Sequence, residues 1–162
     1  MKNTFVITFL VGVGAIALAV AGVFYMQRGA HMELPGRIVK IRTLPIDDTH
    51  CIAVADFQIH NPSDYIFMVR GVTLILENTD GSQHPGVTSS EMDAQRFFDG
   101  TPALGPKFSK GLIARQVVPA HATEDHMVLA SFDFPEAALQ ARRNFIVHLD
   151  EVDGKSFDLT EK

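Results

Sequence analysis

Two hydrophobic patterns divide the chain. From Asn3 to Gln27 no residue is charged, and residues 5–26 are almost continuously apolar. A run of this length is sufficient for one helix across the hydrocarbon core of a bilayer, which is roughly 30 Å thick. After residue 36, short runs of apolar residues alternate with polar ones, as in half-buried strands. We therefore expect one transmembrane helix followed by a β domain.

The strand-like runs are short, rich in β-branched and aromatic residues, and bounded by turn formers. They cover residues 37–44, 51–59, 65–77, 112–118, 126–134, 144–152 and 155–160. Asp80-Gly81 and Asp153-Gly154 are typical of hairpin turns, because glycine and aspartate tolerate a positive φ angle. About seven strands in one domain predict an all-β fold, specifically an immunoglobulin- or fibronectin-III-like β-sandwich.

Two segments outside the strand pattern predict short helices. Thr88 and Glu91 have the spacing of a capping box. The helix that follows them ends near Gly100 and carries Phe97 and Phe98 on one side. The later stretch "PEAALQARR" begins with proline, which suits a first helical turn, and ends with two arginines that complement the helix dipole.

The predicted organisation has three parts. Residues 1–27 form an N-terminal transmembrane anchor, which contacts the lipid bilayer through residues 4–26. Residues 28–36 contain polar residues, two glycines and a proline and form a short tether. Residues 37–162 have the length of one domain.

Small residues in the anchor have the spacing of a helix-packing motif. Ala15 and Ala19 are four positions apart, and Gly22 follows them, which permits close approach of another membrane helix. Alanine and glycine are also common in membrane helices that do not pair, so both interpretations stay open.

Cleavage and orientation of the anchor have two interpretations each. Residues 17–19 or 19–21 have the small-residue pattern of a signal-peptide cleavage site, but the apolar run continues to Met26, which favours a retained anchor. The basic residues after the run favour a domain inside the cell, whereas the two-residue start resembles an uncleaved signal. We expect a single-pass protein of the cell membrane with its domain on the extracytoplasmic (periplasmic) side.

Composition excludes several classes of function. The chain has 14 Lys and Arg against 19 Asp and Glu, a formal charge of −5, and no basic patch, so we expect no nucleic-acid partner. Cys51 is the only cysteine, which rules out an intramolecular disulfide and a cysteine-based metal cluster. Phosphate-loop and dinucleotide motifs are absent from the sequence. We therefore expect no cofactor and no enzymatic activity.

Two polar clusters contain residue types used in catalysis or metal binding. In His60-Asn61-Pro62-Ser63-Asp64 the side chains of consecutive residues splay apart, so we interpret Asn61-Pro62 as the centre of a turn between strands. His121 and His126 flank two acidic residues but lack the spacing of paired ligands on a helix. We interpret the second cluster as a solvated loop, with a metal site as the alternative.

Met92, Phe97 and Phe98 are the candidate partner contacts. They belong to the predicted helix that interrupts the strands. Paired aromatic residues on such an insertion either cover the sandwich or contact a partner, and both interpretations stay open.

The stretch "VADFQIHNPSDYIFMVRGVTLILENTDG" resembles the water-stress and hypersensitive-response type of late embryogenesis abundant (LEA-like) domain. In that family an alternating strand runs into Asn-Pro, here Asn61-Pro62, and a later strand ends in a glycine turn, here at Gly81. The resemblance implies a seven-stranded sandwich and a non-enzymatic role in desiccation tolerance or adhesion-like binding. The chain departs from the family pattern after Gly81, where residues 88–108 form an insertion.

These patterns predict a membrane-anchored, non-enzymatic binding domain. We expect it to be an accessory or structural subunit of a larger membrane protein complex or an envelope scaffold, with other membrane or envelope proteins as partners. The alternative is a stress-protective LEA-like protein that acts on membranes or client proteins.

Overall fold

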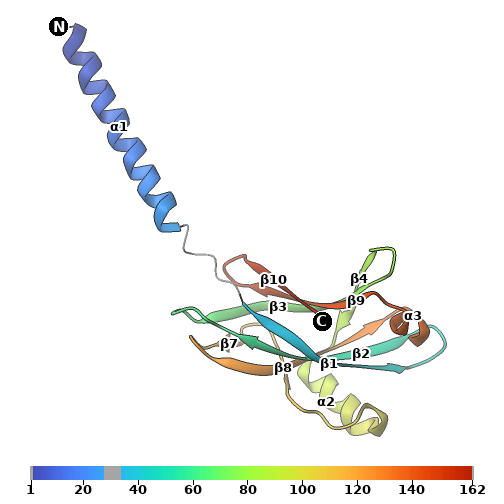
Figure 1. Cartoon of the computed structure of the whole chain (residues 1–162). Coiled ribbons are helices and arrows are strands. Elements are labelled where there is room, and N and C mark those ends of the chain that lie inside the picture. The colour runs from blue at the N-terminus through green and yellow to red at the C-terminus, as the bar shows by residue number, and fades with distance from the viewer. Residues whose placement is uncertain (1, 28–33, 162) are drawn as a thin grey trace. The chain divides into compact units, whose positions relative to one another are not determined.

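Figure 1 shows the computed structural model of the chain, which describes residues 2–27 and 34–161. The chain divides into two compact units, Met1–Met32 and Glu33–Lys162, and each unit is described by itself. Most of the predicted tether, residues 28–33, lies outside the described residues.

The first unit contains one α-helix, α1, at Lys2–Gln27. Ala15, Ala19 and Gly22 lie on this helix and are exposed, and a Cβ added at Gly22 would meet nothing within 4 Å. A search of the described residues identifies no helix that is long and apolar enough to cross a membrane. The anchor at residues 1–27 therefore stays a prediction.

The second unit is an all-β sandwich of two five-stranded sheets among the described residues, as the alternating pattern predicts. The first sheet contains β1 (Gly36–Pro45), β2 (Cys51–His60), β8 (Thr123–Phe132), β5 (Val87–Thr88) and β6 (Lys110–Gly111). The second sheet contains β10 (Ser156–Thr160), β9 (Asn144–Glu151), β3 (Phe67–Glu77), β4 (Gln83–Pro85) and β7 (Val117–Val118).

The strand order gives the sandwich a recognisable connectivity. The order β1-β2-β8-β5 in one sheet and β10-β9-β3-β4 in the other corresponds to the ABED and GFC sheets of immunoglobulin-type sandwiches, with a C′ strand added to the second. The strand count exceeds the expected seven, because β4, β5, β6 and β7 are only two or three residues long and leave no periodic signal in the sequence.

The predicted strand at residues 112–118 is wrong. Only Val117–Val118 of that stretch is a strand, β7, which pairs with β3, whereas Lys110–Gly111 just before it pairs in parallel with β8 in the other sheet. The chain crosses from one sheet to the other between these pairs, and Arg115 takes a φ of 66° there. An apolar run that changes sheet cannot be one strand.

The core lies between the sheets, and a second apolar layer lies outside the first sheet. Phe132 of β8 and Phe145 of β9 meet across the sandwich with ring centroids 5.9 Å apart. On the outer face, Ile52 and Val54 of β2 pack against Phe98 of the helix α2 (Glu91–Gly100). Both faces of β2 are therefore buried, and Figure 1 shows α2 beside the sheet that contains β1, β2 and β8.

The two predicted helices exist, and α2 ends at Gly100 as predicted, but the start of α2 and the end of the second helix differ from the prediction. The capping residue of α2 is Ser90, whose hydroxyl accepts from the Asp93 N–H. Thr88 lies in β5 instead, and its hydroxyl donates to the Val72 carbonyl. The capping-box prediction is wrong because tertiary pairing extends the strand to Thr88 before the helix begins.

The second predicted helix is the short α3, at Glu136–Gln140, with Pro135 as its N-cap. It ends before Arg142, so the arginines do not lie in its last turn as expected. Arg142 donates instead to the Leu139 carbonyl at 3.0 Å and to the Glu161 carboxylate. The ion pair with Glu161 holds the arginine beyond the helix end.

Glu151 provides a test of how burial affects stability. Its carboxyl is buried at the end of β9, and burial, followed by the nearby Asp153 charge, raises its pKa above the ordinary 4.5. A carboxyl group whose pKa is higher in the folded protein contributes stability below its unfolded-state pKa, and this contribution is lost as pH rises through the folded-state pKa. Wild-type protein therefore loses stability above about pH 4.5 through this group.

We expect Glu151→Gln to lack this loss, because glutamine does not ionise. The difference in free energy of unfolding, variant minus wild type, should become more positive from about pH 4 to about pH 7 in denaturant titrations. Asp48→Asn removes one exposed carboxylate and serves as the control, for which we expect a smaller change. An equal pH dependence for both variants would contradict the assignment.

Candidate functional site

Arg42 on β1 holds the insertion, defined here as residues 89–116, against the outer face of the first sheet. Its Nη1 donates to the carbonyls of Leu104 and Pro106 at 2.8 and 2.9 Å. Its Nη2 donates to Asp56 Oδ2 on β2 at 2.7 Å. Both side chains of this ion pair are nine-tenths buried. Arg42 therefore connects two strands to the loop that follows α2.

Aromatic rings complete the surroundings of Arg42. Its guanidinium carbon lies 5.0 Å from the Phe98 ring centroid and 5.2 Å from that of Phe108, within the range of cation–π attraction. Phe98 is part of the buried layer under α2, whereas Phe108 belongs to the loop beyond it. The same cation thus fixes the position of Phe108 at the surface.

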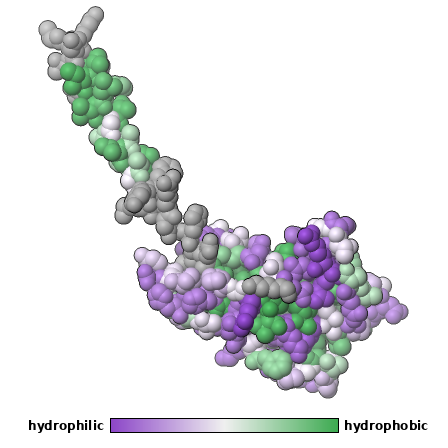
Figure 2. Space-filling view, in the orientation of Figure 1, coloured by the Kyte–Doolittle hydropathy of each residue, from purple (hydrophilic) through white to green (hydrophobic). Residues whose placement is uncertain are grey.

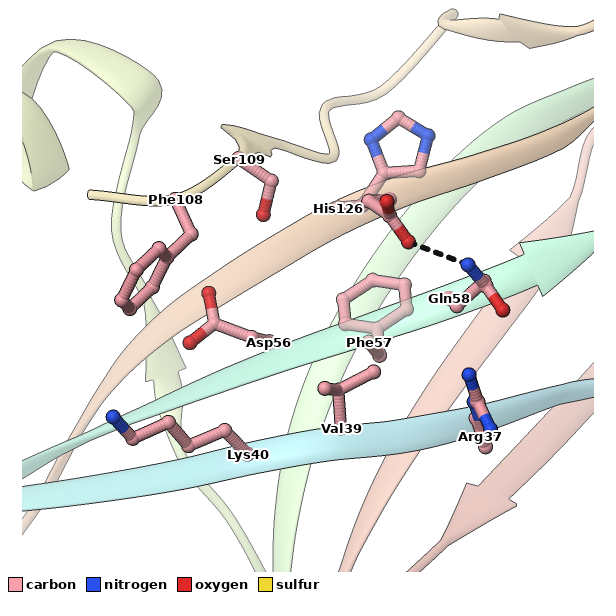
Figure 3. A pocket seen from close by; sticks show the side chains of 10 residues that line it. Arg37, Val39, Lys40, Asp56, Phe57, Gln58, Phe108, Ser109 and His126 are labelled. Carbon is pink, nitrogen blue, oxygen red and sulfur yellow. Dashed lines mark hydrogen bonds between the residues drawn. The ribbon is translucent and has the colours of Figure 1, made fainter. Parts of the chain in front are cut away.

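Beside Phe108, the outer face of the first sheet forms an open groove of about 440 Å³, the Phe108 groove (Figure 3). It is lined by Arg37, Val39, Lys40, Asp56, Phe57, Gln58, Phe108, Ser109, Asp125 and His126. Phe108 is 63% exposed and Val39 is 60% exposed. Two large apolar side chains therefore face solvent in a groove that is lined mostly by strands of the first sheet.

A β-bulge shapes one wall of the groove. The pairing of β1 with β2 shifts between Ile38 and Lys40, so that Val39 is the extra residue. A bulge bends its strand and re-aims side chains. Here it places Val39 at the exposed surface of the groove.

The exposed charges of the groove lie on opposite walls. Arg37 and Lys40 are exposed on β1, and the Lys40 ammonium lies 5.4 Å from the Phe108 ring centroid. Asp125 lies on β8, where it accepts a hydrogen bond from Gln58 Nε2 at 2.8 Å, the dashed line in Figure 3. The β1 wall is therefore cationic, and the β8 wall carries one anion.

Asp56 lies at the floor of the groove and is buried. Burial raises the pKa of its carboxyl above the ordinary value, against the opposing effect of the Arg42 charge. Asp56 Oδ1 and Arg42 Nε have no hydrogen-bond partner among the described residues. Because Asp56 is bonded to Arg42, it does not cancel the exposed charge of the β1 wall, which comes from Arg37 and Lys40.

His126 is buried beneath the same region. Its Nε2 lies 3.0 Å from Glu124 Oε2, and its Nδ1 has no partner in the described part of the chain. Its ring centroid lies 6.2 Å from that of Phe57, the neighbouring residue on β2. The predicted pair His121 and His126 does not come together as one site, because His121 Nε2 pairs with Asp64 Oδ1 at 3.0 Å.

The other predicted residues divide between core and surface. Phe98 is only 8% exposed and packs on the sheet, Phe97 is 36% exposed, and Met92 is 64% exposed. Met92 and Ile113 line a shallow hollow next to α2. The groove at Phe108 was not predicted from the sequence. The signal that could have indicated it is the stretch "GPKF", which places an aromatic residue in a proline-containing loop of the insertion.

Asn61 is a structural anchor of the turn between β2 and β3. Its Nδ2 donates to the carbonyls of Tyr65, Val118 and Pro119 at 2.8, 3.2 and 3.1 Å, and it is fully buried. Its Oδ1 accepts from the Ser63 N–H and hydroxyl. The Asn61 amide therefore ties the turn to the end of β7 and to the residue that follows it.

The turn does not assemble a catalytic triad. His60 Nδ1 lies 2.9 Å from Thr123 Oγ1, the Ser63 hydroxyl bonds Asn61 and Tyr65, and Asp64 pairs with His121. Pro62 is the second residue after β2, and Gly81 takes a φ of 84° in the turn before β4. Among the described residues, no group of three or more His, Cys, Asp and Glu is placed to hold a metal ion.

Comparisons with known proteins give structural likenesses only, and two of them are described below. No family model matches the chain, and no curated protein matches it. The archaellum periplasmic stator protein FlaG from Sulfolobus acidocaldarius is 8% identical with a TM-score of 0.35, over 78% of this chain and 98% of that chain. The structural-genomics target SoR45 is 10% identical with a TM-score of 0.35, over 82% of this chain and 81% of that chain. Likeness at this level carries no argument about function, and the LEA-like resemblance stays a prediction.

We expect Arg42→Met to lower the free energy of unfolding by about 3–5 kcal/mol, because it leaves the buried Asp56 carboxyl without its partner. Arg70→Met is the matched control, since Arg70 is mostly exposed and pairs with Asp150 at the surface; its cost should be under about 1 kcal/mol. Denaturant unfolding measures both. Equal costs would show that Arg42 does not hold the insertion.

We expect Asn61→Ala to cost about 2–4 kcal/mol, because three carbonyls lose their donor in a buried site. Asn61→Asp keeps the shape but replaces the donor by an acceptor, so it should be at least as destabilising at neutral pH. Thermal and denaturant unfolding of both variants test this. A stable Asn61→Asp variant would mean that shape alone holds the turn.

Proposed function

We propose that this chain is a membrane-anchored, non-enzymatic β-sandwich domain on the extracytoplasmic side, and that it binds a partner protein as an accessory subunit of a membrane complex or envelope scaffold. The apolar run at residues 5–26 supports the anchor. The signal-like N-terminus supports the extracytoplasmic side.

The observation that carries the binding role is the exposure of Phe108 and Val39 in one groove. Large apolar side chains at a hollow, bordered by polar residues, are typical of protein contact sites. In Figure 2 the visible face of the domain is mostly hydrophilic and contains an apolar area. The buried Arg42 contacts hold Phe108 in place, which lowers the entropy lost when a partner binds.

Site-directed photo-crosslinking in intact cells tests this proposal. A photoreactive phenylalanine analogue replaces Phe108, and the same analogue replaces Tyr65 as the control, because Tyr65 is 75% exposed and does not line the groove. We expect a discrete crosslinked product at position 108 and none at position 65. The full chain, purified in mild detergent, should also migrate with a partner on a native gel.

Two results would contradict the proposal. One is an identical crosslinking pattern at both positions. The other is a lone monomer in mild detergent together with no product at position 108.

A further inference from the structure

We propose that the Phe108 groove binds an extended acidic segment of the partner protein, with two carboxylates facing Arg37 and Lys40 and one apolar side chain against Phe108. This inference rests on the proposed function, because it names the partner chemistry for the same groove.

The bulge in β1 gives the two cations a defined spacing. Arg37 is opposite Gln58 and Lys40 is opposite Asp56 across the shifted register. Gln58 and Asp56 are two residues apart on β2 and therefore point to the same face. Arg37 and Lys40 consequently share that face, about 7 Å apart along the strand, and Figure 3 shows both on the β1 side of the groove.

An extended segment matches this spacing. Side chains at positions i and i+2 of an extended chain point the same way and are also about 7 Å apart. Two carboxylates separated by one residue would therefore each face one cation. A helix places its neighbouring side chains three or four residues apart, so the alternating pattern distinguishes an extended partner.

The charges on the β1 wall are available to a partner. The Arg37 side chain makes no ion pair or hydrogen bond in the described part of the chain. The Lys40 charge acts on the carboxylate of Asp56, which is already bonded to Arg42 at 2.7 Å. On the opposite wall, Asp125 is bonded to Gln58. Two exposed cations on β1 therefore outnumber the single exposed anion on β8.

Phe108 supplies the apolar contact beside Lys40. The ammonium lies 5.4 Å from the Phe108 ring centroid, while 63% of the Phe108 surface remains exposed. A partner can therefore place an apolar side chain against the exposed Phe108 ring and a carboxylate beside the Lys40 ammonium next to it. The expected pattern is acid, any residue, acid, any residue, apolar residue.

Fluorescence anisotropy of the full chain in mild detergent tests the pattern. The labelled probe is the peptide Gly-Ser-Glu-Ser-Glu-Ser-Leu-Ser-Gly, and two comparison peptides replace both glutamates by lysine or the leucine by serine. We expect both comparison peptides to bind at least about tenfold more weakly. Binding of the probe should weaken as ionic strength rises from about 0.05 M to about 0.5 M.

Charge-reversed variants locate the binding. Arg37→Glu/Lys40→Glu should weaken binding of the probe at least about tenfold, whereas Arg37→Lys/Lys40→Arg should retain it. Arg70→Glu/Arg96→Glu makes the same change in net charge away from the groove and should leave the affinity within about twofold. Circular dichroism confirms that each variant is folded.

Three outcomes overturn the inference: no binding of the probe, equal binding by wild type and Arg37→Glu/Lys40→Glu, or equal weakening by the Arg70→Glu/Arg96→Glu control. Competition with glycerol phosphate tests a lipid headgroup, and groove binding of that anion without the peptide also overturns it. A specific crosslink at position 108 combined with any of these outcomes leaves the proposed function standing and rejects only the acidic segment.

Discussion

The ion pair of Arg42 and Asp56 is the interaction on which the functional surface depends. One guanidinium bonds a carboxylate of the sheet, two carbonyls of the loop after α2, and two aromatic faces. Buried ion pairs of this kind contribute little net stability, because desolvation of the charges offsets their attraction. What the pair supplies is position: it fixes where the insertion lies on the apolar outer face of the sheet.

This placement explains the unusual burial of β2. In a sandwich with one solvated outer face, alternate residues of a strand are polar, but here Ile52 and Val54 face outward under α2. The insertion therefore replaces solvent over one end of the sheet and leaves the other end open. The Phe108 groove lies at that border, where Arg37 and Lys40 stay exposed.

A second constraint acts at the turn between β2 and β3. The Asn61 amide connects that turn to the end of β7 and to the residue that follows it, and the two segments are 57 residues apart. In the long connection between β5 and β8, Arg42 holds the middle, at Leu104 and Pro106, and Asn61 holds the later part, at Val118 and Pro119. With the connection held on both sides of Phe108, that residue is presented by a supported loop, which reduces the entropy that a partner must overcome.

The sequence by itself determined the elements whose signal is local. Alternation identified the long strands, glycine identified the turns at Gly81 and Gly154, and the polarity of His60 to Asp64 indicated a turn. Short strands such as β5 and β6, the cap at Ser90, and the end of α3 depend on pairing with distant segments, so local pattern gave wrong boundaries there. The groove was decided only by tertiary structure, because Phe108 is far in sequence from Arg37 and Lys40. They meet because a bulge re-aims one strand and a buried cation holds a loop beside it, and neither event has a periodic signature.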